Sequence, residues 1–351
     1  MQPNVLVTIV LGGLALFRPR SKVVCIIFFL FMWTLWGFNL WNGDYVAYME
    51  EYNYPMWDSI EVGYKVICGF FSSWLPFQGF LIIVSGCILS FFCYCGLKYT
   101  HFPALFSLLY FPMFILEFVY LRNYICLVFL FYAFFRLIFE NGNTKTSVVF
   151  VLLASTIHIF SICFLPIVLL LKSKINYRSL LVLVFIFSIL ALVASQTVIN
   201  STSYLSSKAD VYARTGGNAI SMTTPFHIFV VLVCYIVYQK TKFKGIPFSK
   251  SAKFFVNFNI LSLILLPVYF IVPYTASRSL RLLIVLNLFF FLYLLWGATK
   301  KTKIYSSLGI IFSCLTIGYF FSIQKFEFVI LPLYNCNALW GYDSAFQLIS
   351  Y

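Results

Sequence analysis

The sequence predicts an all-α polytopic membrane protein, and three observations carry that prediction. Apolar residues make up 62% of the 351 positions, and the mean hydropathy is +0.95. Charged residues amount to 10% and fall in the gaps between long apolar runs. A soluble domain could not bury this much apolar surface, whereas the chain has room for about 11–12 crossings at roughly 20 residues each. We expect one integral membrane domain over residues 1–351, with outer loops at 41–78 and 200–225.

The expected membrane segments follow the apolar runs, which are 4–17, 23–40, 79–97, 102–120, 123–139, 147–171, 179–199, 226–238, 254–273, 282–298 and 304–322. We expect the first of them to be retained as a short helix. The run Val5–Phe17 leads into Arg18, Pro19 and Arg20, and not into the small residues of a signal-peptide cleavage site. The runs show no internal repeat, which weakens a transporter interpretation.

The distribution of Lys and Arg predicts the orientation of the chain. Basic residues concentrate in four gaps that we expect on the cytoplasmic side: 18–22, 172–178, 239–253 and 299–303. Simple alternation fails if 147–171 crosses the membrane once. It is restored if this segment is a re-entrant pair of half-helices, with its tip near Ser155–Phe160. The pair would place His158 within the membrane near its outer half, where irregular backbone must be covered by protein or line a cavity. The alternative is one long tilted helix with an ordinary buried His.

The first outer gap combines aromatic rings with acidic side chains. Its carboxylates are Asp44, Glu50, Glu51, Asp58 and Glu61, and its rings include Tyr45, Tyr48 and Tyr64. Rings stack on the C–H faces of sugars while carboxylates accept hydrogen bonds from hydroxyls, so this composition favours a sugar-binding surface. The alternative is the aromatic belt that gathers Tyr and Trp at any membrane interface. That belt does not explain the cluster of carboxylates.

Arginines at the outer ends of helices are candidates for binding an anion. Arg122 lies at an outer junction of two apolar runs, where a charge usually faces a partner or a cavity. It either binds phosphate through its planar guanidinium or pairs with Glu117. Arg278 and Arg281 are three residues apart, so they share a face if residues 277–281 open a helix. Cations at a helix N-terminus are unfavourable unless an anion lies between them, so we expect a bound anion there, and the alternative is a solvated face.

The remaining features bound the function. The loop 200–225 contains Arg214 and Gly216-Gly217 and closes at Thr224-Pro225, a helix start; we expect a mobile outer loop able to cover a groove.

Most of the ten cysteines lie inside apolar runs and none form a Cys-x-x-Cys pair, so we expect neither a metal nor a cofactor. The +14 net charge reflects the cytoplasmic Lys/Arg bias and does not indicate nucleic-acid binding.

Several of these positions together resemble the EpsG-like group of Wzy-type polysaccharide polymerases, which includes O-antigen polymerases. The likeness runs over nearly the whole chain, and each motif alone is weak. Its parts are Asp44-Tyr45-x-x-Tyr48, Glu61-x-Gly63-Tyr64, Arg122, His158, an outer Arg278 or Arg281, and Pro332-x-Tyr334-Asn335. The family's Arg is commonly followed by Gln, whereas Asn123 stands here.

The resemblance implies a GT-C-like, metal-independent glycosyltransferase of the bacterial inner membrane with its active site facing the periplasm. Such an enzyme transfers the growing glycan from undecaprenyl diphosphate onto a lipid-linked oligosaccharide repeat unit, with the bilayer and a chain-length regulator as further partners. Arg122, Arg278 and Arg281 would stabilise the leaving diphosphate. His158 is a candidate general base with Asp44 and Glu61 as rivals, while Tyr45, Tyr48, Tyr64, Asn123 and Arg214 would bind substrate. The alternatives are a flippase for the same lipid or a membrane acyltransferase.

Overall fold

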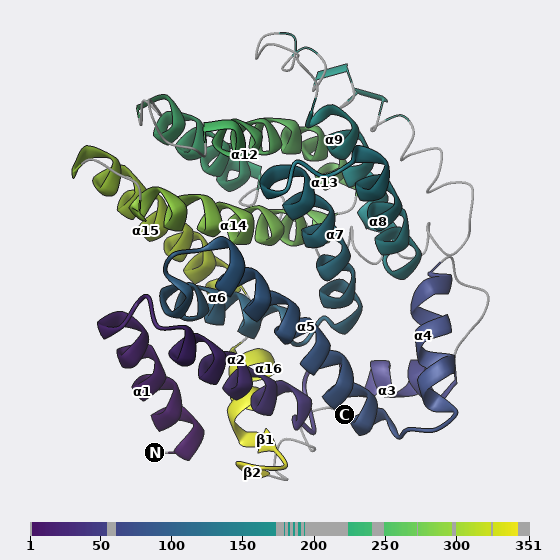
Figure 1. Ribbon diagram of the computed structural model, residues 1–351. Helices are drawn as coiled ribbons and strands as arrows, with labels where there is room; N and C mark the ends of the chain where they lie inside the picture. Colours follow the sequence, from purple (N-terminus) through teal and green to yellow (C-terminus); the bar gives the residue numbers. More distant parts are fainter. Residues whose placement is uncertain are drawn as a thin grey trace. The chain divides into compact units, whose positions relative to one another are not determined.

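The protein is known from a computed structural model that describes most of the chain. The described residues are 2–54, 61–172, 224–240, 249–271, 273–296, 300–323 and 326–342, with scattered positions between 179 and 193. Over these residues the chain is almost entirely helical (Figure 1), which confirms the all-α class. Within them, three helices have the length and composition to cross a membrane, namely Phe77–Tyr99, Leu121–Phe139 and Arg278–Leu295.

The order of elements follows the apolar runs closely. In the first part of the chain the helices are α1 (Pro3–Phe17), α2 (Lys22–Gly37), α3 (Tyr45–Asn53), α4 (Val62–Ser72), α5 (Phe77–Tyr99), α6 (Pro103–Glu117), α7 (Leu121–Phe139) and α8 (Thr144–Ile157). A 3₁₀ turn, Ile159–Phe164, leads into α9 (Leu165–Leu170). The expected segment 179–199 and the loop 200–225 lie mostly outside the described residues.

The second part resumes with a helix over Thr224–Lys240, which begins at the expected Thr-Pro start. It continues with α12 (Ser249–Ser262), a 3₁₀ turn (Leu263–Leu265), α13 (Leu266–Ile271), α14 (Pro273–Trp296), α15 (Lys300–Ile323) and α16 (Phe326–Asn335). A small antiparallel pair closes the described chain, with β1 (Cys336–Asn337) against β2 (Gly341–Tyr342).

Local sequence explains where several helices begin. Pro3 and Pro103 lie in the first turns of α1 and α6, where a missing N–H breaks no intrahelical hydrogen bond. The Ser21 hydroxyl accepts a hydrogen bond from the Val24 N–H at 3.2 Å and so caps α2. The first outer gap was expected as a loop, but it folds largely as α3 and α4. Both helices bury one face: Tyr48 and Tyr52 on α3, and Tyr64, Lys65 and Cys68 on α4.

The Cα packing divides the chain into two compact units, which we describe separately. Unit 1 comprises Met1–Val128, Thr156–Ile159 and Cys314–Tyr351, and unit 2 comprises Phe129–Ser155 and Phe160–Ser313. In unit 1, α2 packs against α5 and α6. A Cβ at Gly37 would lie 2.9 Å from Ser85 Oγ, and one at Gly96 would lie 2.6 Å from Phe106, so the helices approach closely at these glycines.

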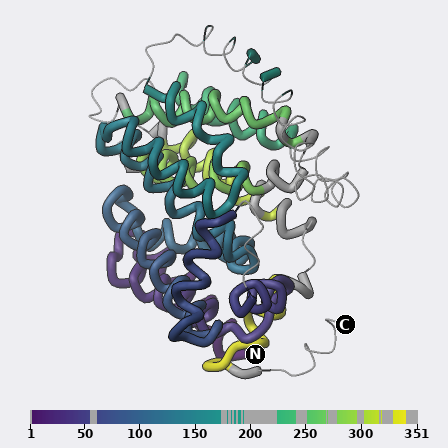
Figure 2. The backbone as a smooth tube through the Cα atoms, turned by 90° about the vertical axis from the view of Figure 1, so that its right-hand side faces the viewer, coloured from purple at the N-terminus to yellow at the C-terminus, as the bar shows by residue number. Residues whose placement is uncertain are grey.

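The C-terminal segment of unit 1 is fastened to its N-terminal helices. Figures 1 and 2 both draw α16 and the strand pair beside α2. The Asn4 amide donates to the Tyr334 carbonyl at 2.7 Å, and the Tyr334 hydroxyl lies 3.1 Å from Thr8 Oγ1. The Asn39 amide donates to the Pro332 carbonyl at 2.9 Å. The Pro-x-Tyr-Asn motif thus joins the two ends of the described chain.

Unit 2 contains a buried polar network between its helices. His227 Nε2 lies 2.8 Å from Ser262 Oγ, and the Tyr269 hydroxyl lies 2.8 Å from His227 Nδ1. The Ser262 hydroxyl donates to the Asn259 carbonyl. That bond leaves the serine oxygen to accept from Nε2–H, so Nδ1 accepts from the tyrosine. The Asn259 side chain also exchanges two hydrogen bonds with Asn287, at 2.8 and 2.9 Å.

Candidate functional site

A buried carboxylate, Glu61, is the centre of a charged cluster in unit 1. Glu61 immediately precedes α4 and is only 3% exposed. One of its oxygens accepts a hydrogen bond from Arg122 Nη1 at 2.8 Å, and the other lies 3.4 Å from His158 Nδ1. Two of the candidate catalytic residues of the sequence therefore meet at a third residue that was predicted to bind substrate.

Arg122 lies in the first turn of α7 and is held by acids and rings. Its Nη1 also donates to Glu51 Oε1 at 3.2 Å, so one guanidinium faces two carboxylates. The guanidinium carbon lies 5.6 Å from the ring centroid of Tyr48 and 5.5 Å from that of Tyr64, within the range of cation–π contacts. The rings predicted to stack on sugar therefore flank the arginine.

The backbone at Gly63 allows the cluster to close. A Cβ at this position would lie 2.2 Å from Thr156 Oγ1 and 2.9 Å from Thr156 Cβ, distances that no side chain tolerates. Gly63 therefore lets α4 approach the end of α8 directly. These contacts account for the Glu-x-Gly-Tyr pattern. The glutamate contacts Arg122 and His158, the glycine lets α4 approach Thr156, and the tyrosine ring packs against the Arg122 guanidinium.

His158 occupies a break in the helical backbone. α8 ends at Ile157 and the 3₁₀ turn begins at Ile159, so the irregular backbone falls within the expected tip Ser155–Phe160. The ammonium of Lys172 donates to the Asn141 carbonyl at 3.1 Å, so both ends of segment 141–172 meet and the chain turns back between them. The His158 side chain is 16% exposed. The side of the membrane to which these ends belong stays a prediction.

Asn123 binds the partner that the sequence suggested for its neighbour Arg122. Its amide donates to Glu117 Oε2 at 2.6 Å, and both residues are buried. The ion pairs of Arg122 are with Glu51 and Glu61, so the proposed pairing of Arg122 with Glu117 is wrong. Glu117 and Asn123 form a structural pair between the end of α6 and the start of α7.

The start of the outer gap belongs to another contact. The Tyr45 hydroxyl donates to Gln78 Oε1 at 3.1 Å, and its ring packs edge-on against Phe77 with centroids 5.2 Å apart. Tyr45 thereby fixes α3 to the beginning of α5. Asp44 is partly exposed just before α3, and its backbone N–H donates to Asn42 Oδ1 at 3.1 Å. The roles of both residues in binding substrate stay predictions.

The remaining arginines lie in unit 2 or outside the described residues. α14 begins at Pro273, so the expectation that residues 277–281 open this helix is wrong. Pro273 suits the first helical position, which places Arg278 and Arg281 in later turns and not at the N-terminus. Arg281 is 3% exposed and Arg278 is partly exposed. Arg214 lies outside the described residues.

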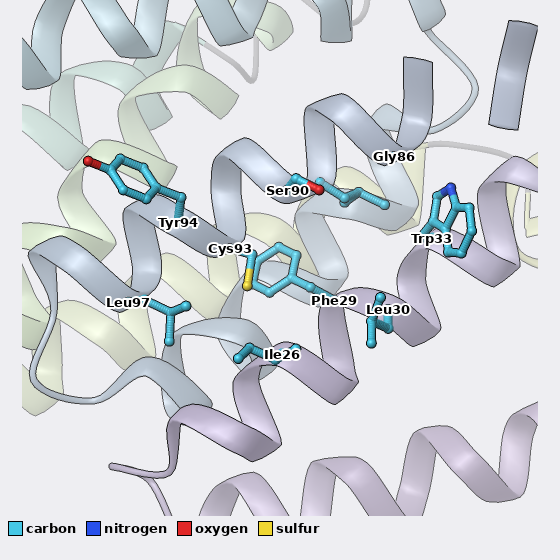
Figure 3. Close-up of a pocket in the computed structure, with 10 residues that line it drawn as sticks. Ile26, Phe29, Leu30, Trp33, Gly86, Ser90, Cys93, Tyr94 and Leu97 are labelled. Atoms are coloured by element: carbon cyan, nitrogen blue, oxygen red, sulfur yellow. The ribbon is translucent and has the colours of Figure 1, made fainter. Parts of the chain in front are cut away.

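A cavity between α2 and α5 provides a contrast to the charged cluster. It has a volume of about 460 Å³ and is lined by Ile26, Phe29, Leu30, Trp33, Gly86, Leu89, Ser90, Cys93, Tyr94 and Leu97 (Figure 3). The Trp33 indole N–H is already bonded to the Ile82 carbonyl at 2.9 Å. Among the described residues, its lining carries no carboxylate, imidazole or basic group, in contrast to the cluster around Glu61.

Sequence reasoning named Glu51 only as one carboxylate of the outer cluster and Gly63 only as part of a motif, and it did not select Thr156. Glu51 had a signal: it lies three residues after Tyr48, so both share a face once this stretch is read as a helix. The contact between Gly63 and Thr156 joins segments far apart in the chain, and no local pattern indicates it.

Apolar helices with a buried acid, arginine and histidine at one helix break define a helical membrane protein with a polar site. The chain belongs to the EpsG family, whose model matches residues 22–335. This match confirms the resemblance found in the motifs. No curated protein and no solved structure matches the chain.

Proposed function

We propose that this protein is a polysaccharide polymerase. It transfers the growing glycan from undecaprenyl diphosphate onto a lipid-linked oligosaccharide repeat unit at the periplasmic face of a bacterial inner membrane. The single observation that carries the proposal is the contact of Glu61 with both Arg122 and His158 in a chain of the EpsG family. O-antigen synthesis is one pathway class that needs such a reaction.

The chemistry follows from what glycosyl transfer requires. The acceptor hydroxyl attacks the anomeric carbon, the bond from that carbon to the diphosphate oxygen breaks, and the electron pair leaves with the diphosphate. We assign His158 as the base that takes the hydroxyl proton. Glu61, 3.4 Å from Nδ1, would orient the imidazole and stabilise its protonated form, while Arg122 would hold the carboxylate in place.

The leaving diphosphate needs cationic side chains that stabilise its developing charge. Two carboxylates lie on Arg122, so we assign it to positioning Glu61 and Glu51 and not to clamping the diphosphate. Arg278 and Arg281 remain the proposed diphosphate residues, acting without a metal. The segment 141–172, whose ends meet at Lys172 and Asn141, would be a re-entrant pair opening to the cytoplasm in a GT-C-like arrangement, and this would bring His158 toward the outer face.

The test is elongation by the purified protein. Full-length protein in detergent, supplied with a lipid-linked repeat unit, should produce a ladder of longer lipid-linked glycans. His158→Gln should reduce the rate of elongation by at least about 100-fold if the imidazole is the base. His101→Gln, at an exposed histidine between α5 and α6, is the matched control and should leave the rate unchanged. Unextended substrate with wild-type protein, or an acylated product, would overturn the polymerase assignment.

A further inference from the structure

One face of α4 is buried and carries two charged residues. Glu61, Tyr64, Lys65 and Cys68 follow the spacing of a single helical face, and each is at most 3% exposed. Lys65 is 1% exposed. Lysine is almost never buried to this degree unless its ammonium is paired.

The ammonium of Lys65 has no such partner among the described residues. Its Nζ atom is inaccessible to water and makes no hydrogen bond in the part of the chain that the structure describes. The nearby acids Glu51 and Glu61 are both engaged by Arg122. A buried cation without a counter-charge is strongly unfavourable, so Lys65 needs an anion that these residues do not supply.

The opposite face of α4 indicates where that anion comes from. Val62, Val66, Phe70 and the following Trp74 form a row at intervals of four residues, and each is between 49% and 63% exposed. An apolar row of this kind, ending in a tryptophan, is typical of a helix lying at the membrane interface. Anionic groups carried by lipids lie at the same depth. The ligand of Lys65 is therefore expected to be lipid-borne.

We propose that Lys65 binds a phosphate group of an anionic lipid, one helical turn from Glu61. An ammonium with three donors suits phosphate oxygens, and burial strengthens the contact. The phosphate could belong to the isoprenoid-linked substrate or to a bilayer phospholipid, and both offer the same chemistry. The identification with the substrate rests on the polymerase function proposed above.

The experiment compares full-length wild-type protein with Lys65→Met, which keeps the apolar stem and removes the charge. The probes are farnesyl diphosphate, farnesol and dihexanoyl phosphatidylglycerol, with dissociation constants measured in phosphate-free detergent buffer. Farnesyl diphosphate should bind the wild type and raise its Tm, and the substitution should weaken that binding by at least about 10-fold. Lys98→Met, at an exposed lysine of α5, is the matched control and should bind like the wild type.

The ligand-free proteins give a second readout. Lys65→Met should raise the Tm without ligand because it removes an unpaired buried charge, a change that a lysine with a structural partner would not produce. If the wild type binds both dihexanoyl phosphatidylglycerol and farnesyl diphosphate through Lys65, the ligand is a bilayer headgroup. If it binds farnesyl diphosphate alone, the ligand is the substrate. Unchanged affinity in Lys65→Met, or a lower Tm of its ligand-free form, would overturn the proposal. Diphosphate binding without any glycan ladder would instead reject the polymerase function alone.

Discussion

The substitution Gly63→Ala tests the contact on which the cluster depends. The added Cβ would lie 2.2 Å from Thr156 Oγ1 and 2.9 Å from Thr156 Cβ, whereas ordinary contacts begin near 3.4 Å. Rotation of the Thr156 side chain moves the hydroxyl but not Cβ, so α4 and the end of α8 must separate by at least about 0.5 Å, and by about 1.2 Å if the rotamer is kept. Overpacking of this kind costs about 1–3 kcal/mol of folding free energy. The same shift would draw Glu61 away from His158, and a displacement of roughly 1 Å at a reacting group can reduce a rate by about 100-fold.

The assay combines the Tm of the detergent-purified protein with the initial rate of glycan elongation. Gly13→Ala is the matched control, because a Cβ at this helical glycine meets nothing within 4 Å. Alanine there should be neutral or slightly stabilising. In a Thr156→Gly background, Gly63→Ala should lower the Tm and the rate much less than it does in the wild type, because the side chain that it meets is gone. If Gly63→Ala matched Gly13→Ala in both Tm and rate, the close-contact argument would be refuted.

Three further predictions follow from contacts of unit 1. Arg122→Lys should lower the elongation rate by about 100-fold and reduce the Tm, because an ammonium lacks the planar fork that reaches both carboxylates; wild-type kinetics would contradict this. Asn123→Ala should cost about 2–3 kcal/mol of stability by leaving the Glu117 carboxylate without its amide donor, with the KM for lipid-linked substrate unchanged. Tyr334→Phe should cost about 1 kcal/mol, and combining it with Thr8→Val should cost less than the two separate losses added together, as measured by thermal unfolding.

The positions of the helices were largely predictable because the apolar runs encode them. Irregular backbone near His158 was one of two interpretations of the sequence, since a turn within 147–171 restores the alternation of the Lys and Arg gaps, and the re-entrant topology itself stays a prediction. The structure places the break between Ile157 and Ile159. Hydropathy and the distribution of charge are local properties of the sequence, so they predict the positions of helices without knowledge of how the helices pack.

The partners of the site residues were not predictable in the same way. Glu117 was considered for Arg122 because it is five residues away in the chain, but the actual acids are 61 and 71 residues away. Such pairs depend on how α3, α4 and α7 pack, and a single sequence does not contain that information. The start of α14 was misplaced because Pro273 was read as the end of the preceding apolar run, 254–273, and not as the first residue of a helix.

The attachment of the C-terminal segment to α1 and α2 has a consequence for biosynthesis. Asn337 donates to the Thr34 and Leu35 carbonyls at 2.9 and 3.0 Å, and Asn39 donates to the Pro332 carbonyl. These bonds span about 300 residues, so the ribosome must make nearly the whole chain before they form. Until then the Thr34 and Leu35 carbonyls and the Asn39 amide lack these partners, so the packing around the end of α2 is completed only after the last described helix has been made. Loss of the final helix would therefore damage the first part of the protein to be synthesised.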